Sequence, residues 1–417
     1  MTAIFDPLTL PNGAIIPNRL AKAAMEENLA GAGQVPDDRL FTLYRRWSEG
    51  GAGLLITGNV MVDARAMTGP GGVVLDAHSP LEPFRAWSEA AHAGGARVWM
   101  QISHPGRQVE AAMPGVALAP SAIRVDIGSQ SKRFAVPKEM TEQDIAEVIE
   151  MFATTARLAE ETGFDGVEIH GAHGYLLSQF LSPISNRRLD GWGGDIAARS
   201  RLLLAVVRAV RAAVSPGFTV AVKLNSADFQ RGGFDERDAR AVIEMLNREH
   251  VDLVELSGGS YESPAMSGHT SDARTLAREA YFLTFAQELL DVAAMPLMVT
   301  GGITRREVAE VVIGSGVAIA GMATALAYAP TIPRDWRENR PPQVSPKPVQ
   351  WKNKTFAAVA SMALVKDQMM RITDGRPTRA GGSPILAIVK DQLRGRAKLA
   401  RYAAWLPTHP AGKQLVG

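Results

Sequence analysis

Short apolar runs rich in Val, Ile and Leu alternate along the chain with longer segments in which apolar residues recur at helical spacing. Runs of the first kind are typical of strands in a parallel sheet, and segments of the second kind are typical of the helices that connect such strands. The pattern predicts eight strands, near residues 19–23, 53–57, 97–102, 166–170, 219–224, 253–257, 297–300 and 318–321. It predicts helices over residues 37–49, 80–93, 141–161, 196–214, 235–249, 272–292 and 305–314.

Eight alternating units favour an α/β fold, a closed (β/α)8 TIM barrel, over an open doubly wound sheet with the same periodicity. Short extended pieces on either side of an Asn12-Gly13 turn predict an N-terminal β-hairpin ahead of the barrel. Thr141 with Asp144, and Thr304 with Glu307, have the spacing of helix capping boxes that use an acidic residue.

The regular pattern is interrupted after residue 340 by a Pro-rich run that extends to Pro348. We therefore divide the chain into a barrel domain, residues 1–340, and a C-terminal helical extension, residues 341–417. Residues 354–373 and 384–405 are expected to be helical, with a Gly-containing break at residues 375–382. The extension is expected to pack on the barrel or on a partner subunit of a homo-oligomer.

Composition limits the classes of function. The chain has 417 residues with 45 Lys plus Arg against 43 Asp plus Glu, so its net charge of +2 creates no broad field for nucleic acid or an anionic membrane. Small-molecule partners are favoured. Because the chain has no Cys, disulfides, thiolate zinc sites, cysteine nucleophiles and Cys-ligated iron–sulfur clusters are excluded. We find neither a signal-peptide pattern nor an apolar run of about 18 residues, and we expect a cytoplasmic protein.

The most informative stretch begins on the fourth strand at Glu168 and runs to Pro183, across the strand end where barrel active sites lie. His170 and His173 are three residues apart, so both imidazoles can turn toward one carbonyl or nitro oxygen and stabilise charge that develops on it. Tyr175 adds a phenol that is neutral at pH 7 and can deliver a proton nearby. A metal site and structural packing are the alternatives, although the pair has no carboxylate close in sequence.

Glycines follow the last two strands, at Gly301, Gly302 and Gly321, with Met322 next to the third. Loops after strands seven and eight of such barrels commonly bind a phosphate through backbone N–H groups, and glycine lets the backbone approach closely. A Gly-Gly pair alone indicates only a turn, so the prediction of a phosphate site depends on the position of these glycines after the last two strands.

The chain resembles the Old Yellow Enzyme family, also called NADH:flavin oxidoreductases. Four segments carry the resemblance in order and at family-like spacing between Phe5 and about Pro330: residues 18–25, residues 101–107, residues 170–183 and residues 186–194. Each motif alone is weak, and the combination is specific.

The resemblance implies a barrel with noncovalent FMN, reduced by NADH or NADPH, that passes hydride from the flavin to the β-carbon of an activated alkene. His170 and His173 would hold the oxygen of an α,β-unsaturated carbonyl or nitro compound, and Tyr175 would protonate the α-carbon from the opposite face. The family's flavin contacts would fall on this chain's residues Ala24, Met25, Glu26, Asn59, Gln101, Lys223, Gly301, Gly302, Gly321 and Met322. No metal is implied.

Gln101 and His104 end the third strand and Lys223 ends the fifth. A fixed cation at the flavin's pyrimidine edge would stabilise the anionic reduced flavin, and Gln101 could hydrogen-bond the same ring. A lysine at a strand end is, however, more often the partner in a buried ion pair.

Four positions depart from the family pattern. Glu26 stands where relatives usually have Thr or Cys, and an ionised carboxylate there disfavours an anionic reduced flavin. Lys223 stands where many relatives have Arg, which keeps the charge and loses the planar fork. Met322 replaces an Arg that usually pairs with the phosphate, which implies weaker FMN binding. Trp192 replaces a common Tyr, and the lack of Cys excludes the iron–sulfur subgroup.

Other functions remain open from the sequence. A barrel lyase or isomerase could use the glycine loops for a substrate phosphate and need no flavin. A barrel with Glu26 and Met322 could also bind flavin or ligand without turnover. Within the family, the enzyme could act mainly as an NADH oxidase, a dehydrogenase or a double-bond isomerase.

Overall fold

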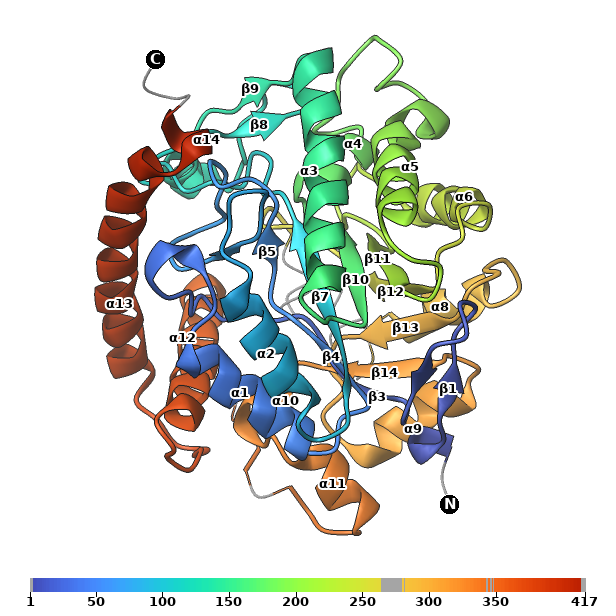
Figure 1. Cartoon of the computed structure of the whole chain (residues 1–417), viewed down its shortest axis with the longest axis vertical. Helices are drawn as coiled ribbons and strands as arrows, with labels where there is room; N and C mark the ends of the chain where they lie inside the picture. Colours follow the sequence, from blue (N-terminus) through green and yellow to red (C-terminus); the bar gives the residue numbers. More distant parts are fainter. Residues whose placement is uncertain are drawn as a thin grey trace.

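We describe a computed structural model of the chain, which covers residues 3–263, 280, 282–342, 344–345, 347 and 349–413. Its centre is a ring of eight parallel strands (Figure 1). In ring order these are β3 (Leu20–Lys22), β4 (Leu54–Ile56), β7 (Arg97–Ser103), β10 (Gly166–Gly171), β11 (Thr219–Asn225), β12 (Leu253–Ser257), β13 (Leu297–Thr300) and β14 (Ile319–Met322). The pairing of β10 with β7 and of β14 with β3 closes the ring. The predicted (β/α)8 barrel is confirmed, and the open doubly wound sheet is wrong.

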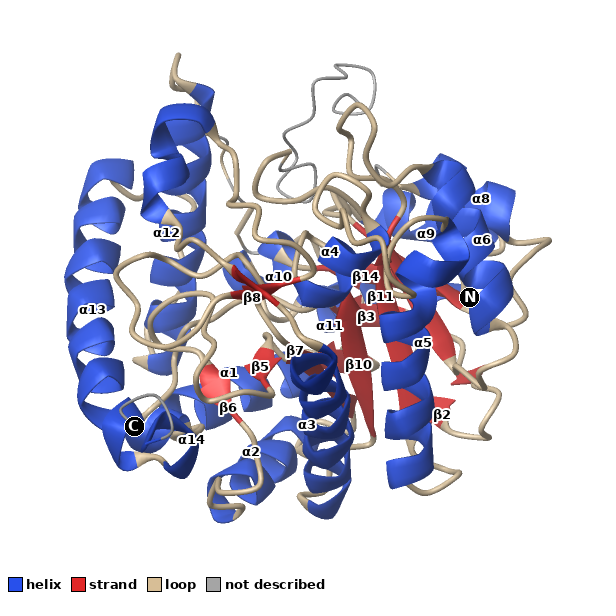
Figure 2. Ribbon diagram, turned by 90° about the horizontal axis from the view of Figure 1, so that it is seen from above, coloured by secondary structure: helices blue, strands red, loops and turns tan. Residues whose placement is uncertain are grey.

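Helices follow the strands and surround the barrel (Figure 2). Those within the barrel repeat are α1 (Asp38–Glu49), α2 (Glu82–His92), α3 (Glu142–Glu161), α4 (Leu176–Leu181), α5 (Ile196–Ala213), α6 (Glu236–Leu246), α8 (Leu283–Leu289), α9 (Arg306–Gly314), α10 (Thr324–Tyr328) and α11 (Ile332–Arg337). Of the predicted helix over residues 272–292, residues 283–289 are helical as α8 and residues 290–292 form a turn, while residues 272–279 and 281 lie outside the described part of the chain. Short strands in the loops are β5 (Val60–Met61), β6 (Val73–Val74), β8 (Leu118–Ala119) and β9 (Lys138–Glu139).

Side-chain caps fix where several helices begin. Thr141 accepts a hydrogen bond from the Asp144 N–H, and Asp144 accepts one from the Thr141 N–H, so the predicted capping box of α3 is confirmed. The box predicted at Thr304 is wrong, because α9 begins one residue later than that prediction requires and Arg305 is its N-cap residue. Each satisfied cap is worth about 1 kcal/mol because it pairs N–H groups that have no partner within the helix.

The barrel interior has two kinds of layer. Near the N-terminal ends of the strands it is apolar, with Leu54, Trp99, Leu253 and Met298 in one cluster. The hairpin formed by β1 (Leu8–Thr9) and β2 (Ile15–Ile16) closes that end, and the side chain of Ile16 packs into the same cluster. The predicted N-terminal hairpin is confirmed. Toward the C-terminal ends the inward-facing residues are polar, so the candidate chemistry lies at that end.

The C-terminal extension packs against the barrel. Helix α12 (Lys354–Thr373) contacts α1, α10 and α13 (Pro384–Trp405), and the last pair forms an antiparallel hairpin at one side of the molecule (Figures 1 and 2). The Tyr402 hydroxyl, on α13, donates a hydrogen bond of 2.8 Å to the Ala64 carbonyl. The extension is thus held by the chain's own barrel, while the domain boundary at residue 340 stays a prediction.

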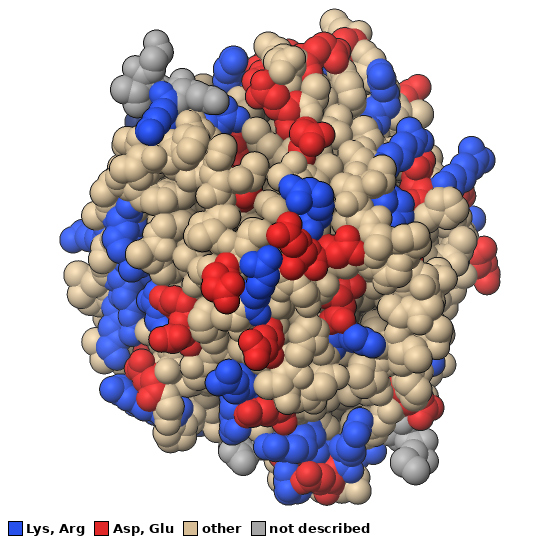
Figure 3. All heavy atoms as spheres, in the orientation of Figure 1, with Lys and Arg blue, Asp and Glu red and all other residues tan. Residues whose placement is uncertain are grey.

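The molecular surface shows acidic and basic side chains intermixed over most of one face, with basic side chains aligned along α13 (Figure 3). In the part of the chain that the structure describes, no helix is both long enough and apolar enough to cross a bilayer.

Candidate active site

His170, His173 and Tyr175 gather at the C-terminal end of β10. The ring centres of His170 and His173 are 5.1 Å apart, and those of His170 and Tyr175 are 4.8 Å apart, both pairs meeting edge to face. His170 and Tyr175 are buried and His173 is half-buried. The three predicted catalytic side chains therefore form one compact cluster.

A tight turn brings the second histidine back over the first. His173 has a φ of 60° and Gly174 a φ of 73°, so two consecutive residues adopt the left-handed region. Neighbouring strands hold the turn: the Asn225 side chain accepts from the His173 N–H at 3.1 Å, and the His173 ring shares a 2.7 Å hydrogen bond with the Ser257 hydroxyl. A strained turn held by two strand ends is expected where a side chain must be positioned for chemistry.

Burial keeps both imidazoles neutral. Burial, followed by the nearby positive charge of Lys223, lowers the pKa of His173 from its ordinary value to about 3. Burial, followed by the charges of His173 and Lys223, lowers the pKa of His170 well below its ordinary value. The His170 Nδ1 accepts the Ala172 N–H at 3.3 Å, which places the proton of the neutral ring on Nε2. His170 therefore offers one N–H donor.

Tyr175 has a phenolic partner that sequence reasoning missed. Its hydroxyl lies 3.1 Å from the hydroxyl of Tyr261, which is on the loop after β12. Burial, followed by the interaction with Tyr261 and the charge of Glu26, raises the pKa of Tyr175 well above its ordinary value. The amide of Gln108 links the two regions, because it donates to the His173 carbonyl at 3.0 Å and accepts from the Tyr261 N–H. Tyr175 is thus a protonated phenol with a second phenol beside it.

Below the histidines lies a buried charged layer. Gln101 donates a 2.6 Å hydrogen bond to Glu168, and the Lys223 ammonium contacts the carboxylate of Glu255. Burial and then the neighbouring Glu255 charge raise the pKa of Glu168. Burial alone would lower the pKa of Lys223, but the carboxylates of Glu255 and Glu168 outweigh it and the pKa is raised. Lys223 therefore stays charged as a buried ion-pair partner, the alternative that the sequence left open. Its contact with flavin stays a prediction.

Residues after β3 form one part of the barrel rim. Ala24, Met25 and Glu26 are half-buried there, and Asn59 lies beside Glu26 in a small crevice. The Thr68 hydroxyl donates a short hydrogen bond to the Glu26 carboxylate. The charge of Glu26 also helps to raise the pKa of Tyr175, so this carboxylate acts electrostatically on the His–Tyr cluster.

A cavity of about 580 Å³ opens beside this rim. It is lined by Met25 and Glu26, by the glycines Gly301, Gly302 and Gly321, and by residues of α12. That volume falls in the range of about 300–1,000 Å³ usual for small-molecule sites. His170, His173 and Tyr175 are not part of its lining, whereas Glu26, whose charge helps to raise the pKa of Tyr175, is part of it.

The glycines that follow β13 and lie near the end of β14 line the cavity with backbone atoms alone. Gly302 has a φ of 72° and Gly301 a φ of 136°, conformations that residues with a Cβ rarely adopt. A Cβ on Gly321 would meet the Thr300 hydroxyl at 2.0 Å, so no side chain fits there. Met322 does not line the cavity: its side chain packs into the core outside the barrel, and its carbonyl accepts from the Ala23 N–H at 2.9 Å.

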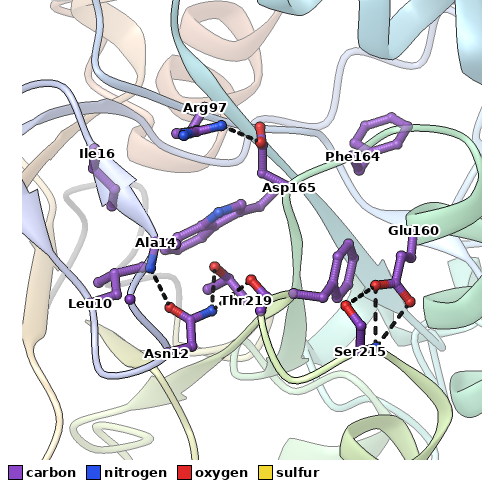
Figure 4. A pocket seen from close by; sticks show the side chains of 14 residues that line it. Leu10, Asn12, Ala14, Ile16, Arg97, Glu160, Phe164, Asp165, Ser215 and Thr219 are labelled. Carbon is purple, nitrogen blue, oxygen red and sulfur yellow. Dashed lines mark hydrogen bonds and ion pairs between the residues drawn. The ribbon is translucent and has the colours of Figure 1, made fainter.

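A second cavity, of about 440 Å³, lies at the opposite end of the barrel (Figure 4). Its polar side chains bond to one another or to backbone: Arg97 pairs with Asp165 at 2.8 Å, and Asn12 donates to the Thr219 hydroxyl at 3.2 Å. Because these groups are already paired, the cavity resembles a structural cleft more than a binding site. Catalytic residues in such barrels lie at the other end.

The segment 186–194 of the sequence signature has a structural role here. The Asn186 amide donates to the Phe180 and Trp192 carbonyls at 2.7 Å, and Arg188 donates to the Met140 carbonyl at 2.6 Å. These bonds fix the chain after α4. The Nε2 atom of His104 lies 3.8 Å from the carboxylate of Asp63. Among the described residues no three His, Asp or Glu side chains are grouped as metal ligands would be.

Comparison with known proteins agrees with this geometry. Residues 3–343 match the NADH:flavin oxidoreductase / NADH oxidase family. The chain is 38% identical over 354 residues to the NADH-dependent flavin oxidoreductase iliE of Neonectria sp. (strain DH2), a match covering 79% of this chain and 46% of that protein. It is 35% identical over 352 residues to the protein of the same name from Hypocrea jecorina (strain QM6a), covering 79% of this chain and 87% of that one.

Among solved structures, the old yellow enzyme homologue from Zymomonas mobilis superposes with a TM-score of 0.70 at 24% identity, over 82% of this chain and 94% of that one. The fold is therefore shared with that protein. The chain spans about half the length of the Neonectria relative, at 46%.

Proposed function

The chain belongs to the NADH:flavin oxidoreductase / NADH oxidase family, which includes the Old Yellow Enzymes, and on that premise we propose that it is an FMN-dependent ene-reductase. In this proposal NADH or NADPH reduces the flavin, and an α,β-unsaturated carbonyl or nitro compound is the acceptor. The resemblance found in the sequence is confirmed at the level of the family. The observation that carries the finer proposal is the compact cluster of two neutral imidazoles and one protonated phenol.

His170 and His173 would bind the oxygen of the activating group. Neutral imidazoles donate hydrogen bonds without placing a full positive charge in the site, and a buried donor stabilises negative charge that develops on the oxygen. The Ala172 N–H fixes the proton of His170 on Nε2. Because Ser257 and Asn225 hold His173, its position does not have to be established during the reaction.

Tyr175 would deliver the proton to the α-carbon. A phenol with a raised pKa stays protonated at neutral pH until an acceptor carbanion forms beside it. The Tyr261 hydroxyl at 3.1 Å gives the resulting phenolate an immediate hydrogen-bond donor and a source from which the proton can be replaced. Tyr261 is thus proposed as the first step of a proton path to Tyr175.

The residues at the barrel mouth fit FMN. When bound, FMN supplies the hydride that reduces the alkene. Gly301, Gly302 and Gly321 line the cavity and would offer backbone to its phosphate, and Ala24, Met25, Glu26 and Asn59 would line the ring. Gln101 and Lys223 would lie below the pyrimidine, where Glu255 reduces the net charge that Lys223 presents. Met322 would contribute backbone only.

Membership in a flavin-dependent family argues against a flavin-free lyase or isomerase. The remaining alternatives are separated by an anaerobic titration of the purified protein. We expect a yellow protein whose visible flavin band is bleached by NADH or NADPH and returns when an unsaturated ketone is added, with the saturated ketone as product. A flavin that is reduced by the nicotinamide but returns only with oxygen would indicate an NADH oxidase and would reject the ene-reductase.

A further inference from the structure

We propose that the C-terminal extension completes the cofactor site, with Lys366 on α12 providing the positive charge that faces the FMN phosphate. This inference rests on the proposed position of FMN at the mouth of the barrel. It assigns a binding role to a helix that lies outside residues 3–343, the part of the chain that matches the family.

The first observation is that α12 forms a wall of the cavity. Two rims meet there: the glycine-bearing ends of β13 and β14 on one side, and the α12 residues Ser361, Val365, Lys366 and Met369 on the other. Helix α12 is fixed in place because it packs against both α1 and α10, and α10 directly follows β14. A ligand on the glycine loops therefore has α12 as a neighbour.

The second observation is that strand eight supplies no cation. Met322 follows Gly321 and is fully buried in the core outside the barrel. Of the described residues that line this cavity, two are basic, Lys347 and Lys366, and one is acidic, Glu26. Glu26 belongs to the rim after β3 and already accepts from Thr68. A positive side chain strengthens the binding of a phosphate dianion, and the two lysines are the cationic side chains among the described residues of this cavity.

The third observation is an excess of positive charge where α12 meets α13. Helix α13 carries Lys390, Arg394, Arg396, Lys398 and Arg401 against a single acidic residue, Asp391 (Figure 3). The Lys366 ammonium lies 3.7 Å from Asp391. Burial, followed by the positive charge of Lys366, lowers the pKa of Lys398 to about 8. Asp391 thus acts on both Lys366 and Lys398, and an anion bound nearby would relieve the repulsion between these two lysines.

The chain contains a matched control. Lys366 of α12 pairs with Asp391 of α13 at 3.7 Å, and Lys390 of α13 pairs with Asp367 of α12 at 3.8 Å. Both are ion pairs across the same helix hairpin, but only Lys366 lines the cavity. Lys366→Met and Lys390→Met therefore remove equivalent surface pairs, and only the first removes the proposed phosphate partner.

The test compares FMN with riboflavin, which has the same ring and no phosphate. The full-length protein is dialysed against an excess of either flavin, diluted, and the Kd is measured from the fluorescence of the released flavin. We expect Lys366→Met to raise the Kd of FMN about tenfold, as for the loss of a partly exposed charged hydrogen bond, and to leave the Kd of riboflavin unchanged. Lys366→Arg should retain FMN affinity, and Lys390→Met should change neither Kd.

A structural role for Lys366 would give a different pattern. Asp391→Asn breaks the same ion pair and keeps the Lys366 charge, so we expect FMN affinity to be retained or increased. The inference is overturned if Asp391→Asn weakens FMN binding as much as Lys366→Met, or if Lys366→Met weakens FMN and riboflavin equally. If the unmodified protein binds neither flavin, the proposed function itself fails.

Discussion

The two ends of the barrel both contain histidines among polar groups, and they use them in opposite ways. At the N-terminal end, His92 lies 2.6 Å from Asp165, which also pairs with Arg97. The hydrogen bond to Asp165 raises the pKa of His92 from its ordinary value. At the mouth, His170 and His173 have no carboxylate partner in the described structure, and burial lowers the pKa of both. Paired polar groups stabilise the fold, whereas neutral donors held in place remain available for a substrate.

The largest expected difference between the two ends of the barrel is in activity. His170→Ala or His173→Ala should slow reduction of the alkene by about 10²–10³-fold, because each removes a donor to the developing oxyanion. Flavin reduction by the nicotinamide should change much less. His92→Ala, at the other end, should leave both half-reactions unchanged. The measurement is stopped-flow absorbance of the flavin in each half-reaction, and equal losses in all three variants would remove the distinction between the ends.

A smaller expected difference between the two ends of the barrel is in how their histidines make the free energy of unfolding depend on pH. The folded pKa of His173 is about 3 and the unfolded value 6.5, so its contribution is fully present above about pH 6.5 and is lost as the pH falls toward 3. Between pH 6.5 and 5 this histidine alone should cost about 1–2 kcal/mol of the free energy of unfolding. His92 has the opposite sign: its contribution is present below about pH 6.5 and is lost as the pH rises through its folded pKa.

Urea unfolding at several pH values checks this contrast. Relative to the unmodified protein, His173→Asn should reduce the loss of stability on acidification, and His92→Asn should increase it or leave it unchanged. A His173→Asn variant with an unaltered pH dependence would mean that His173 is not held neutral in the folded protein.

The pattern of apolar runs along the sequence was sufficient to predict where the barrel strands lie. The strand predicted at residues 253–257 is β12 (Leu253–Ser257), and that at residues 297–300 is β13 (Leu297–Thr300), because short apolar runs between turns have few alternative structures. Closure could not be derived in the same way, since it depends on the pairing of β10 with β7. The prediction for Thr304 failed because capping spacing alone does not specify at which residue a helix begins.

The candidate site was foreseen where it lies on one continuous segment. His170, His173 and Tyr175 are near one another in sequence, so a single strand end and turn bring them together. Tyr261 is 86 residues from Tyr175 and reaches it from a different loop, and no local spacing indicates that contact. The outward direction of Met322 could have been inferred from alternation along β14, because Gly321 beside it faces the interior.

The ion pair of Lys223 in the buried charged layer could not be predicted from local spacing either. Its partner Glu255 is adjacent only because β11 and β12 pair in register, with Lys223 directly opposite Glu255. The position of α12 beside the cavity could likewise not be predicted from the repeated strand–helix pattern, because this helix lies beyond the last strand–helix unit.

The most direct measurement of the central claim is the effect of Tyr175→Phe on the two half-reactions, followed separately by anaerobic stopped flow. The variant keeps the ring that packs against His170 and loses the hydroxyl that lies 3.1 Å from Tyr261. We expect the rate of alkene reduction to fall by about 10²–10⁴-fold, as for loss of a general acid, with the rate of flavin reduction by NADH or NADPH unchanged. An equal change in both half-reactions, or no change in either, would contradict the assignment of Tyr175 as proton donor.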